Sequence, residues 1–104
     1  FLLAFSFDSC TLNYSSFYQL KIPKTNFRGS NLQEVDFTDT DLRSANFDSC
    51  NLAGSLFDNT ILEYTDFRDS RYFHINPEAN YIRNAKFSSD SLLGLLFKYE
   101  IQVD

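Results

Sequence analysis

A five-residue repeat constrains this chain more than any other feature of its sequence. Between Thr25 and Asp69 the sequence divides into nine blocks of five without an insertion, and the third residue of every block is Phe or Leu. A period of five matches neither the 3.6-residue period of a helix nor the two-residue alternation of a strand. A short period that persists over many blocks instead indicates stacked units, each of which buries its apolar side against its neighbours.

The same register extends in both directions and gives fifteen consecutive centres. Between Phe7 and Phe67 the centres alternate Phe with Leu or Ile, so the true period is a multiple of ten residues. The residue before a centre is usually Asn or Asp, and the residue two before it is usually small. The centres are Leu2, Phe7, Leu12, Phe17, Ile22, Phe27, Leu32, Phe37, Leu42, Phe47, Leu52, Phe57, Leu62, Phe67 and Tyr72.

A small residue, Asn or Asp, Phe or Leu and two polar residues together resemble the A(D/N)LXX motif of the pentapeptide-repeat family. The resemblance covers residues 1–75 through the motif, and residues 76–104 through a tail similar to that of some members. It implies an all-β solenoid, a right-handed quadrilateral β-helix with four blocks per coil and a short α-helical C-terminal cap. Residues twenty apart would then stack in four ladders: Phe7–Phe27–Phe47–Phe67, Phe17–Phe37–Phe57, Leu12–Leu32–Leu52–Tyr72 and Ile22–Leu42–Leu62.

The position two before each centre is expected to point inward as well, and it holds mostly small residues, with Leu20 and Val35 as exceptions. Cys10 and Cys50 fall in one such column, two coils apart. At about 4.8 Å per coil their separation is near 10 Å, whereas a disulfide needs Cα atoms within roughly 7 Å. We therefore expect two free, buried thiols.

The pattern stops at Tyr72, and residues 76–104 are expected to cap the same domain. Asn76-Pro77-Glu78 is typical of a helix N-cap with Pro at the first helical position, which predicts a helix over 77–85. Ser88 or Ser89 can cap a second short helix, and residues 99–103 alternate as a short strand would. Because a solenoid end needs covering and relatives form dimers there, this end holds a candidate dimer or cap surface. That surface consists of Leu92, Leu93, Leu95, Leu96 and Phe97.

Signatures of enzymes, cofactor sites and metal sites are absent from the sequence. It contains no GxSxG, no Gly-rich phosphate loop with Lys, no CxxC and no HExxH. His74 is the only histidine, so one chain cannot build a two-His metal site or a His-based acid–base pair. We predict a non-catalytic protein with no cofactor and no metal.

The net charge of −5 disfavours direct binding of nucleic acid, because phosphates must be neutralised by Lys and Arg. No run approaches the roughly 18 apolar residues that span a bilayer, and no signal peptide is recognisable. These features predict a cytoplasmic protein without a membrane segment. Because the chain starts at Phe1 rather than Met, we expect a processed or truncated piece, or a missing disordered N-terminus.

Acidic residues concentrate between Glu34 and Asp69, a stretch that contains nine Asp or Glu residues and only two arginines. Asp36, Asp39 and Asp58 fall on one side that carries no basic residue, which makes this side a candidate acidic interaction face. The resemblance suggests a DNA mimic that binds DNA gyrase or topoisomerase IV, as bacterial quinolone- or toxin-protecting members do. Three carboxylates over less than about 20 Å are sparse, however, beside one duplex charge per about 1.7 Å.

Apolar and Tyr side chains also occupy outward positions. Leu56 and Ile61 stand where the repeat normally has Asn or Asp, and Tyr14, Tyr18 and Tyr64 are outward too. They favour either a protein interface or packing under the C-terminal helices, of which the second is preferred for Leu56 and Ile61. The sequence thus predicts a protein-interaction scaffold with an unknown partner and a possible homodimer through its C-terminal cap. The alternatives are the gyrase-binding mimic and a vestigial or truncated module.

Overall fold

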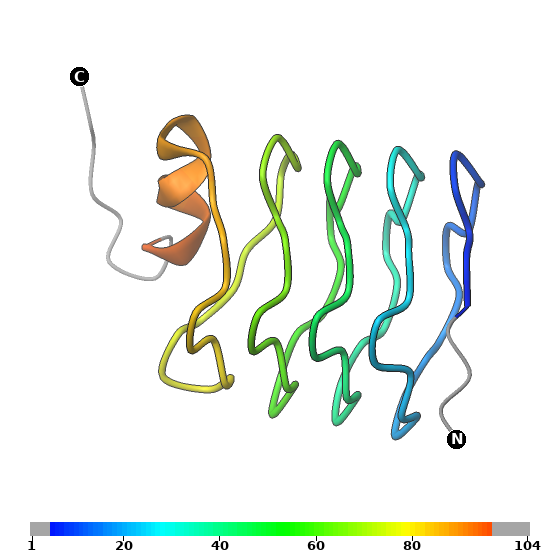
Figure 1. The fold of residues 1–104 in the computed structure, drawn as a ribbon, viewed down its shortest axis with the longest axis horizontal. Helices are drawn as coiled ribbons and strands as arrows, with labels where there is room; N and C mark the ends of the chain where they lie inside the picture. Colours follow the sequence, from blue (N-terminus) through cyan, green and yellow to red (C-terminus); the bar gives the residue numbers. More distant parts are fainter. Residues whose placement is uncertain (1–4, 97–104) are drawn as a thin grey trace.

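The computed structural model describes residues 5–96, which form a stack of similar coils with a short helix at one end (Figure 1). Residues twenty apart pair through isolated parallel β-bridges, from Ser6 with Asn26 to Asp66 with Lys86. Bridges recur every five residues, so each coil of twenty has four sides. Within residues 5–96 no strand is longer than a single bridge. We name the sides after their centres in the first coil: the Phe7, Leu12, Phe17 and Ile22 sides.

Each block of five ends in a tight turn. The amide three residues after a centre donates to the carbonyl of that centre, as Ser30 N does to Phe27 O at 3.0 Å. The residue two after the centre has a positive φ at nearly every block, as in type II turns. Gly29 and Gly54 supply this conformation at two blocks, whereas residues with side chains adopt it at the others. Since that costs an L-residue about 1–2 kcal/mol, the stacking of coils rather than local preference fixes these turns.

Stacked aromatic rings fill the interior. Rings twenty residues apart lie face to face, as Phe27 and Phe47 do with centroids 4.9 Å apart. Rings ten residues apart meet edge-on across the interior, as Phe37 and Phe47 do at 5.5 Å and 87°. Both arrangements are favourable for aromatic pairs, and the Leu and Ile centres fill the space between them. The two Phe ladders expected from the sequence are confirmed.

Small polar side chains two before each centre tie one coil to the next. Thr60 Oγ1 donates to Phe37 O at 2.7 Å, and Thr65 Oγ1 donates to Leu42 O at 2.8 Å. A buried hydroxyl needs such a partner, which explains the preference for Thr and Ser at this inward position. Leu20 was expected to point inward like the other residues two before a centre, but it is 47% exposed. It lies in the first described coil, so no described coil covers it on the N-terminal side.

The five-residue pattern is interrupted after Arg71 and resumes in the same register at Tyr81. Tyr72 was expected to be the last buried centre, but it is 66% exposed and has a φ of 66°. Phe73 is buried instead, with its ring 5.8 Å from that of Phe67. The sequence prediction missed this one-residue shift because Tyr72 and Phe73 are both aromatic and either could serve as a centre.

The helix predicted over 77–85 is wrong, because this segment adds to the coil stack. Tyr81 bridges Ile61, and the ring of Phe87 stacks on that of Phe67 at 5.2 Å. Asn76 Oδ1 accepts the Glu78 amide, so the Asn-Pro-Glu sequence makes a turn. Asn before Pro is typical of a turn as well as of a helix start. Here the segment pairs with the preceding coil, and this pairing favours the turn over the helix. Coil pairing therefore continues beyond the expected boundary at residue 75.

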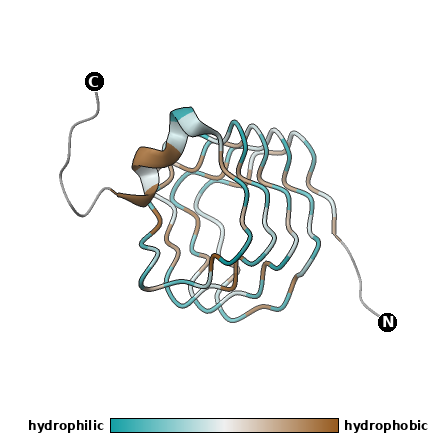
Figure 2. Ribbon diagram, turned by 60° about the vertical axis from the view of Figure 1, so that its left-hand side comes forward, coloured by the Kyte–Doolittle hydropathy of each residue, from teal (hydrophilic) through white to brown (hydrophobic). Residues whose placement is uncertain are grey.

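The 3-10 helix η1 (Ser89–Leu95) lies at the C-terminal end of the coils (Figures 1 and 2). Its Gly94 carbonyl accepts the Ile75 amide at 2.8 Å, and Leu95 packs against the core. A second short helix was expected here with Ser88 or Ser89 as its cap. Ser88 is the N-cap residue, although its side chain makes no capping hydrogen bond. The strand expected over 99–103 lies outside the described residues.

No helix within residues 5–96 is long and apolar enough to cross a bilayer.

Candidate functional site

The three acids of the candidate interaction face lie on the Phe17 side, on two adjacent coils. Asp36 and Asp39 belong to one coil and are half-buried, and Asp58 belongs to the next and is exposed. The Asp39 amide donates to Asp58 O at 3.0 Å, so these two residues are direct neighbours in the stack. The described residues of this side also include Glu78 and contain no Lys or Arg. The sequence-based placement of these acids on one basic-free side agrees with the geometry.

Asp36 also has a local structural role that the sequence analysis missed. Its Oδ1 accepts the amide of Thr38 at 2.9 Å, two residues further along the chain. The same contact recurs in other blocks, for example between Asn46 Oδ1 and the Asp48 amide at 2.8 Å. A short side chain that accepts a hydrogen bond from the backbone two residues on is the reason for Asn or Asp before each centre. Asn can replace Asp36 in this role and would remove only the charge.

Acids on two other sides lie beside arginines. On the Phe7 side, Arg68 Nη2 lies 2.8 Å from Asp66 Oδ2, and this hydrogen bond lowers the pKa of Asp66. On the Ile22 side, burial acts to raise the pKa of Asp41, but hydrogen bonds from Arg43 and its charge outweigh this and lower it. Within residues 5–96, Asp36, Asp39 and Asp58 take part in no ion pair. These three acids therefore present uncompensated charge.

Two exposed apolar groups accompany these acids. Leu56 is 58% exposed and directly follows Asp36 in the bridge column, and Tyr18 is 49% exposed in the first coil. The preferred expectation, that the C-terminal helices cover Leu56, is wrong, because η1 packs elsewhere. Ile61 is half-buried and bridges Tyr81, so a further coil segment rather than a helix lies beside it.

The expected cap or dimer surface is apolar over most of its described part. Leu92 and Leu93 of η1 are 44% and 45% exposed, and Leu96 is 36% exposed. These three leucines line a shallow hollow of about 460 Å³ on the outer surface of η1. Leu95 points the other way, into the core. Phe97 lies outside the described residues.

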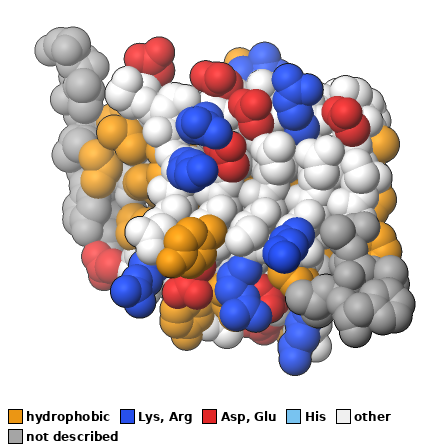
Figure 3. Space-filling model, in the orientation of Figure 1, with side chains coloured by type: hydrophobic (Ala, Val, Ile, Leu, Met, Phe, Trp, Pro, Cys, Tyr) orange, Lys and Arg blue, Asp and Glu red, His pale blue; other side chains and the backbone are white. Residues whose placement is uncertain are grey.

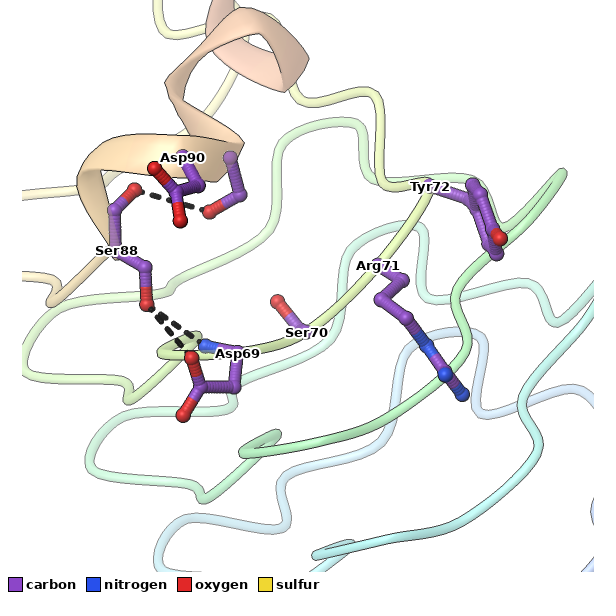
Figure 4. Close-up of a pocket in the computed structure, with 7 residues that line it drawn as sticks. Asp69, Ser70, Arg71, Tyr72, Ser88 and Asp90 are labelled. Carbon is purple, nitrogen blue, oxygen red and sulfur yellow. Dashed lines mark hydrogen bonds between the residues drawn. The ribbon is translucent and has the colours of Figure 1, made fainter.

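A second, polar hollow of about 370 Å³ lies where η1 meets the last complete coil (Figure 4). Ser88 Oγ accepts the Asp69 amide at 2.9 Å and donates to Asp69 Oδ1 at 3.3 Å. Asp90 lies on the same wall, whereas Arg71 and Tyr72 extend away from it. No group of side chains suited to holding a metal ion occurs among residues 5–96. The hydrogen bonds of Ser88 join η1 to the coil.

The two cysteines are free thiols in different surroundings. Cys50 is fully buried, its Sγ donates to Phe27 O at 2.9 Å, and burial raises its pKa to about 11. Cys10 was expected to be buried too, but it is only half-buried, because it lies in the first coil. The absence of a disulfide is confirmed. A thiol with a raised pKa is a poor nucleophile, so Cys50 has a packing role.

The stacking of twenty-residue coils agrees with the comparisons with known proteins. A family profile described as "Pentapeptide repeat region" matches residues 1–67. The chain belongs to the pentapeptide repeat family. The comparison with curated proteins finds no match.

Solved structures of the family show the same fold. HetL of the cyanobacterium Nostoc sp. strain PCC 7120, a pentapeptide repeat protein involved in heterocyst differentiation regulation, superposes with a TM-score of 0.67. The identity is 16%, over 73% of this chain and 35% of HetL. A pentapeptide repeat protein from the Arabidopsis thaliana thylakoid lumen gives a TM-score of 0.56 at 20% identity, over 78% of this chain and 57% of the other. This chain thus spans about a third to just over half of these relatives.

Proposed function

We infer that this pentapeptide repeat protein is a non-catalytic binding module that contacts a protein partner through its Phe17 side. We also infer that its coils form the right-handed quadrilateral β-helix of the family, so that each side is a nearly flat surface. The observation that supports the binding role is the composition of this side. It combines Asp36, Asp39 and Asp58, none of them in an ion pair within residues 5–96, with exposed Leu56 and Tyr18.

The chemistry of this side defines the kind of partner. Uncompensated carboxylates attract a basic protein surface and raise the rate of association. Exposed Tyr and Leu side chains supply the apolar contact that holds such a partner once it has docked. The partner we propose therefore presents Lys or Arg residues around an apolar patch.

The test uses a variant with Asp36, Asp39 and Asp58 all changed to Asn. Asn keeps the side-chain oxygen that accepts the turn amide at position 36, so the coils are expected to fold normally. Cross-linking in the source cells and capture of the parent chain should give a specific partner, and the triple variant should lose it. Binding should also weaken as salt is raised, because salt screens exposed charges.

A charge-matched control separates the Phe17 side from net charge. Asp8, Glu34 and Glu63 lie on the three other sides, and none of them forms an ion pair with another described residue. Their replacement by Asn, Gln and Gln changes the net charge by the same three units. The proposed role requires this control to bind like the parent. Equal losses in the two variants would contradict a specific side and indicate nonspecific attraction.

The second candidate function is a DNA mimic that binds DNA gyrase or topoisomerase IV, and the same basic-free side favours it. It ranks second because Asp36 and Asp39 accept hydrogen bonds within the coil stack and only Asp58 is exposed. Duplex DNA presents one charge per about 1.7 Å, a far denser array. Inhibition of gyrase supercoiling by the parent, lost in the triple Asn variant but kept in the charge-matched control, would move this candidate to first place.

A further inference from the structure

The Ile22 side carries the opposite surface charge from the neighbouring Phe17 side. Among the described residues, its exposed charged groups are all basic: Lys21, Lys24, Arg43 and Arg83. Its two acids are less accessible, because Asp41 is buried and Glu63 is half-buried. The Asp41 carboxylate is also bonded to Arg43, with Oδ2 and Nη2 2.9 Å apart. The surface of the Ile22 side is therefore basic.

Apolar groups lie among these basic residues. Tyr64 and Tyr81 are 59% and 55% exposed, and Ile61 is half-buried. Figure 3 shows such a mixture of basic and hydrophobic side chains over the lower half of the molecule. Basic residues around an apolar patch are the chemistry that the acidic Phe17 side is proposed to recognise. The chain itself therefore carries a surface that fits its own acidic side.

The charges of the two sides also have the same layout. On the Phe17 side, Asp36 and Asp39 lie one residue before and two after a centre, and Asp58 lies one after the centre of the next coil. On the Ile22 side the same three positions hold basic residues one coil earlier in the stack. In the same order these are Lys21, Lys24 and Arg43. Three acids and three basic residues thus match after an offset of one coil.

Building on the proposed function, we propose that its partner is a second copy of this chain. The Phe17 side of one copy binds the Ile22 side of the other, with the coil axes parallel and offset by one coil. Two facing sides with parallel axes run in opposite directions within each coil. Asp36 of one copy therefore faces Lys24 of the other, and Asp39 faces Lys21. Opposite charges placed in this way steer and orient the two copies.

The third acid decides between parallel and antiparallel axes. With parallel axes, Asp58 comes opposite the coil that carries Arg43. Reversed axes would place Asp58 on the other side of the lysine-bearing coil, away from Arg43. Glu78, on the coil after Asp58, comes opposite the coil of Glu63. Arg43 and Arg83 precede and follow Glu63 in its column and offset this like charge.

The contact is small, so the association is weak. The molecule is 22 Å across its shortest axis, and three facing coils at about 4.8 Å each span about 14 Å. The contact thus covers roughly 300 Å² per copy, or about 600 Å² in total, below the roughly 1,000 Å² of a stable interface. Exposed charges supply much of the attraction, so salt should weaken it. Because two different sides meet, each copy added leaves one side of each kind free, and association continues beyond a dimer.

Two complementary variants test the contact. The triple Asn variant keeps the Ile22 side intact, and a variant with Lys21 and Lys24 both changed to Gln keeps the Phe17 side intact. Gln fits the turn at position 24, because Gln19 adopts the same positive φ, 61° against 62° for Lys24. By sedimentation equilibrium at low salt, the mass of the parent should rise with concentration beyond twice 12.1 kDa. Each variant alone should remain a monomer, whereas an equimolar mixture should form a one-to-one dimer, because each variant supplies the side that the other lacks.

A charge-matched control separates the Ile22 side from net charge. Arg71 and Lys86 are exposed on the Leu12 and Phe7 sides, and neither forms an ion pair with another described residue. Their replacement by Gln should leave association unchanged, and an equal loss in this control would overturn the proposal. So would a parent that stays a monomer at several hundred micromolar, or complementary variants that do not combine. These results would leave the proposed function intact, since that function fails only if the triple Asn variant still captures the partner that the parent captures from cells.

A charge swap tests the orientation. Asp39→Lys and Lys21→Asp each place like charges opposite each other, so each should raise the dissociation constant at least about tenfold, and the two together should restore it. Both changes suit the coil, because Lys24 occupies the turn position equivalent to Asp39, and Asp41 follows Lys21 in its column. Circular dichroism melting shows whether each variant is folded. Restoration by Asp39→Lys with Lys24→Asp instead would overturn the parallel arrangement.

Discussion

Replacement of Phe47 by Ala tests how the stacked rings hold the solenoid together. Phe47 is fully buried, and its ring stacks on Phe27 at 4.9 Å and on Phe67 at 5.1 Å. It also meets Phe37 and Phe57 edge-on at 5.5 and 6.2 Å. Truncation of a buried Phe costs about 3–5 kcal/mol. Loss of contacts with four rings places Phe47→Ala toward the upper end of that range.

The effect is a large share of the free energy of unfolding, which is about 5–15 kcal/mol for a domain. At about 4–5 °C per kcal/mol for a chain of this length, the melting temperature should fall by about 15–25 °C in thermal unfolding followed by circular dichroism. Phe7→Ala is the control, because Phe7 is half-buried and its ring pairs, among residues 5–96, with those of Phe17 and Phe27 alone. The free energy of unfolding should fall by only about 1–2 kcal/mol in Phe7→Ala. A Phe47→Ala variant that melts with the parent, or no earlier than Phe7→Ala, would refute the reasoning.

Two further predictions concern the buried thiol and the helix contact. Burial raises the pKa of Cys50 to about 11. Between about pH 9 and 11 the Cys50 thiol therefore keeps its proton in the folded chain and loses it in the unfolded chain. The free energy of unfolding should therefore fall by about 1–2 kcal/mol over this range in urea titrations, and Cys50→Ser should abolish that part of the decrease. Gly94→Ala would place a Cβ 2.5 Å from Phe73, so it should increase hydrogen exchange in η1 while the coils stay protected. Gly29→Ala, at a φ of 71° with only Ser9 Oγ nearby at 3.3 Å, should instead cost about 1 kcal/mol with η1 unchanged.

The coil stack could be predicted because each block repeats the same few physical requirements. A centre fills the interior, a small residue fits beside it, and the residue between them accepts a turn amide. These requirements fix Phe27, Phe47 and Phe67 in one ladder without reference to distant residues. What the pattern did not reveal is the hydrogen bonding of the inward hydroxyls, since a requirement for small volume predicts Ala as well as Thr.

The C-terminal segment could not be predicted in the same way, because pairing with a finished coil decides its conformation. Asn76-Pro77-Glu78 carries a helix signal, yet Tyr81 and Phe87 find partners twenty residues earlier. The surfaces were only partly predictable for a related reason. Exposure of Leu56 depends on where η1 packs, and exposure of Leu20 depends on the first coil having no described neighbour on its outer side.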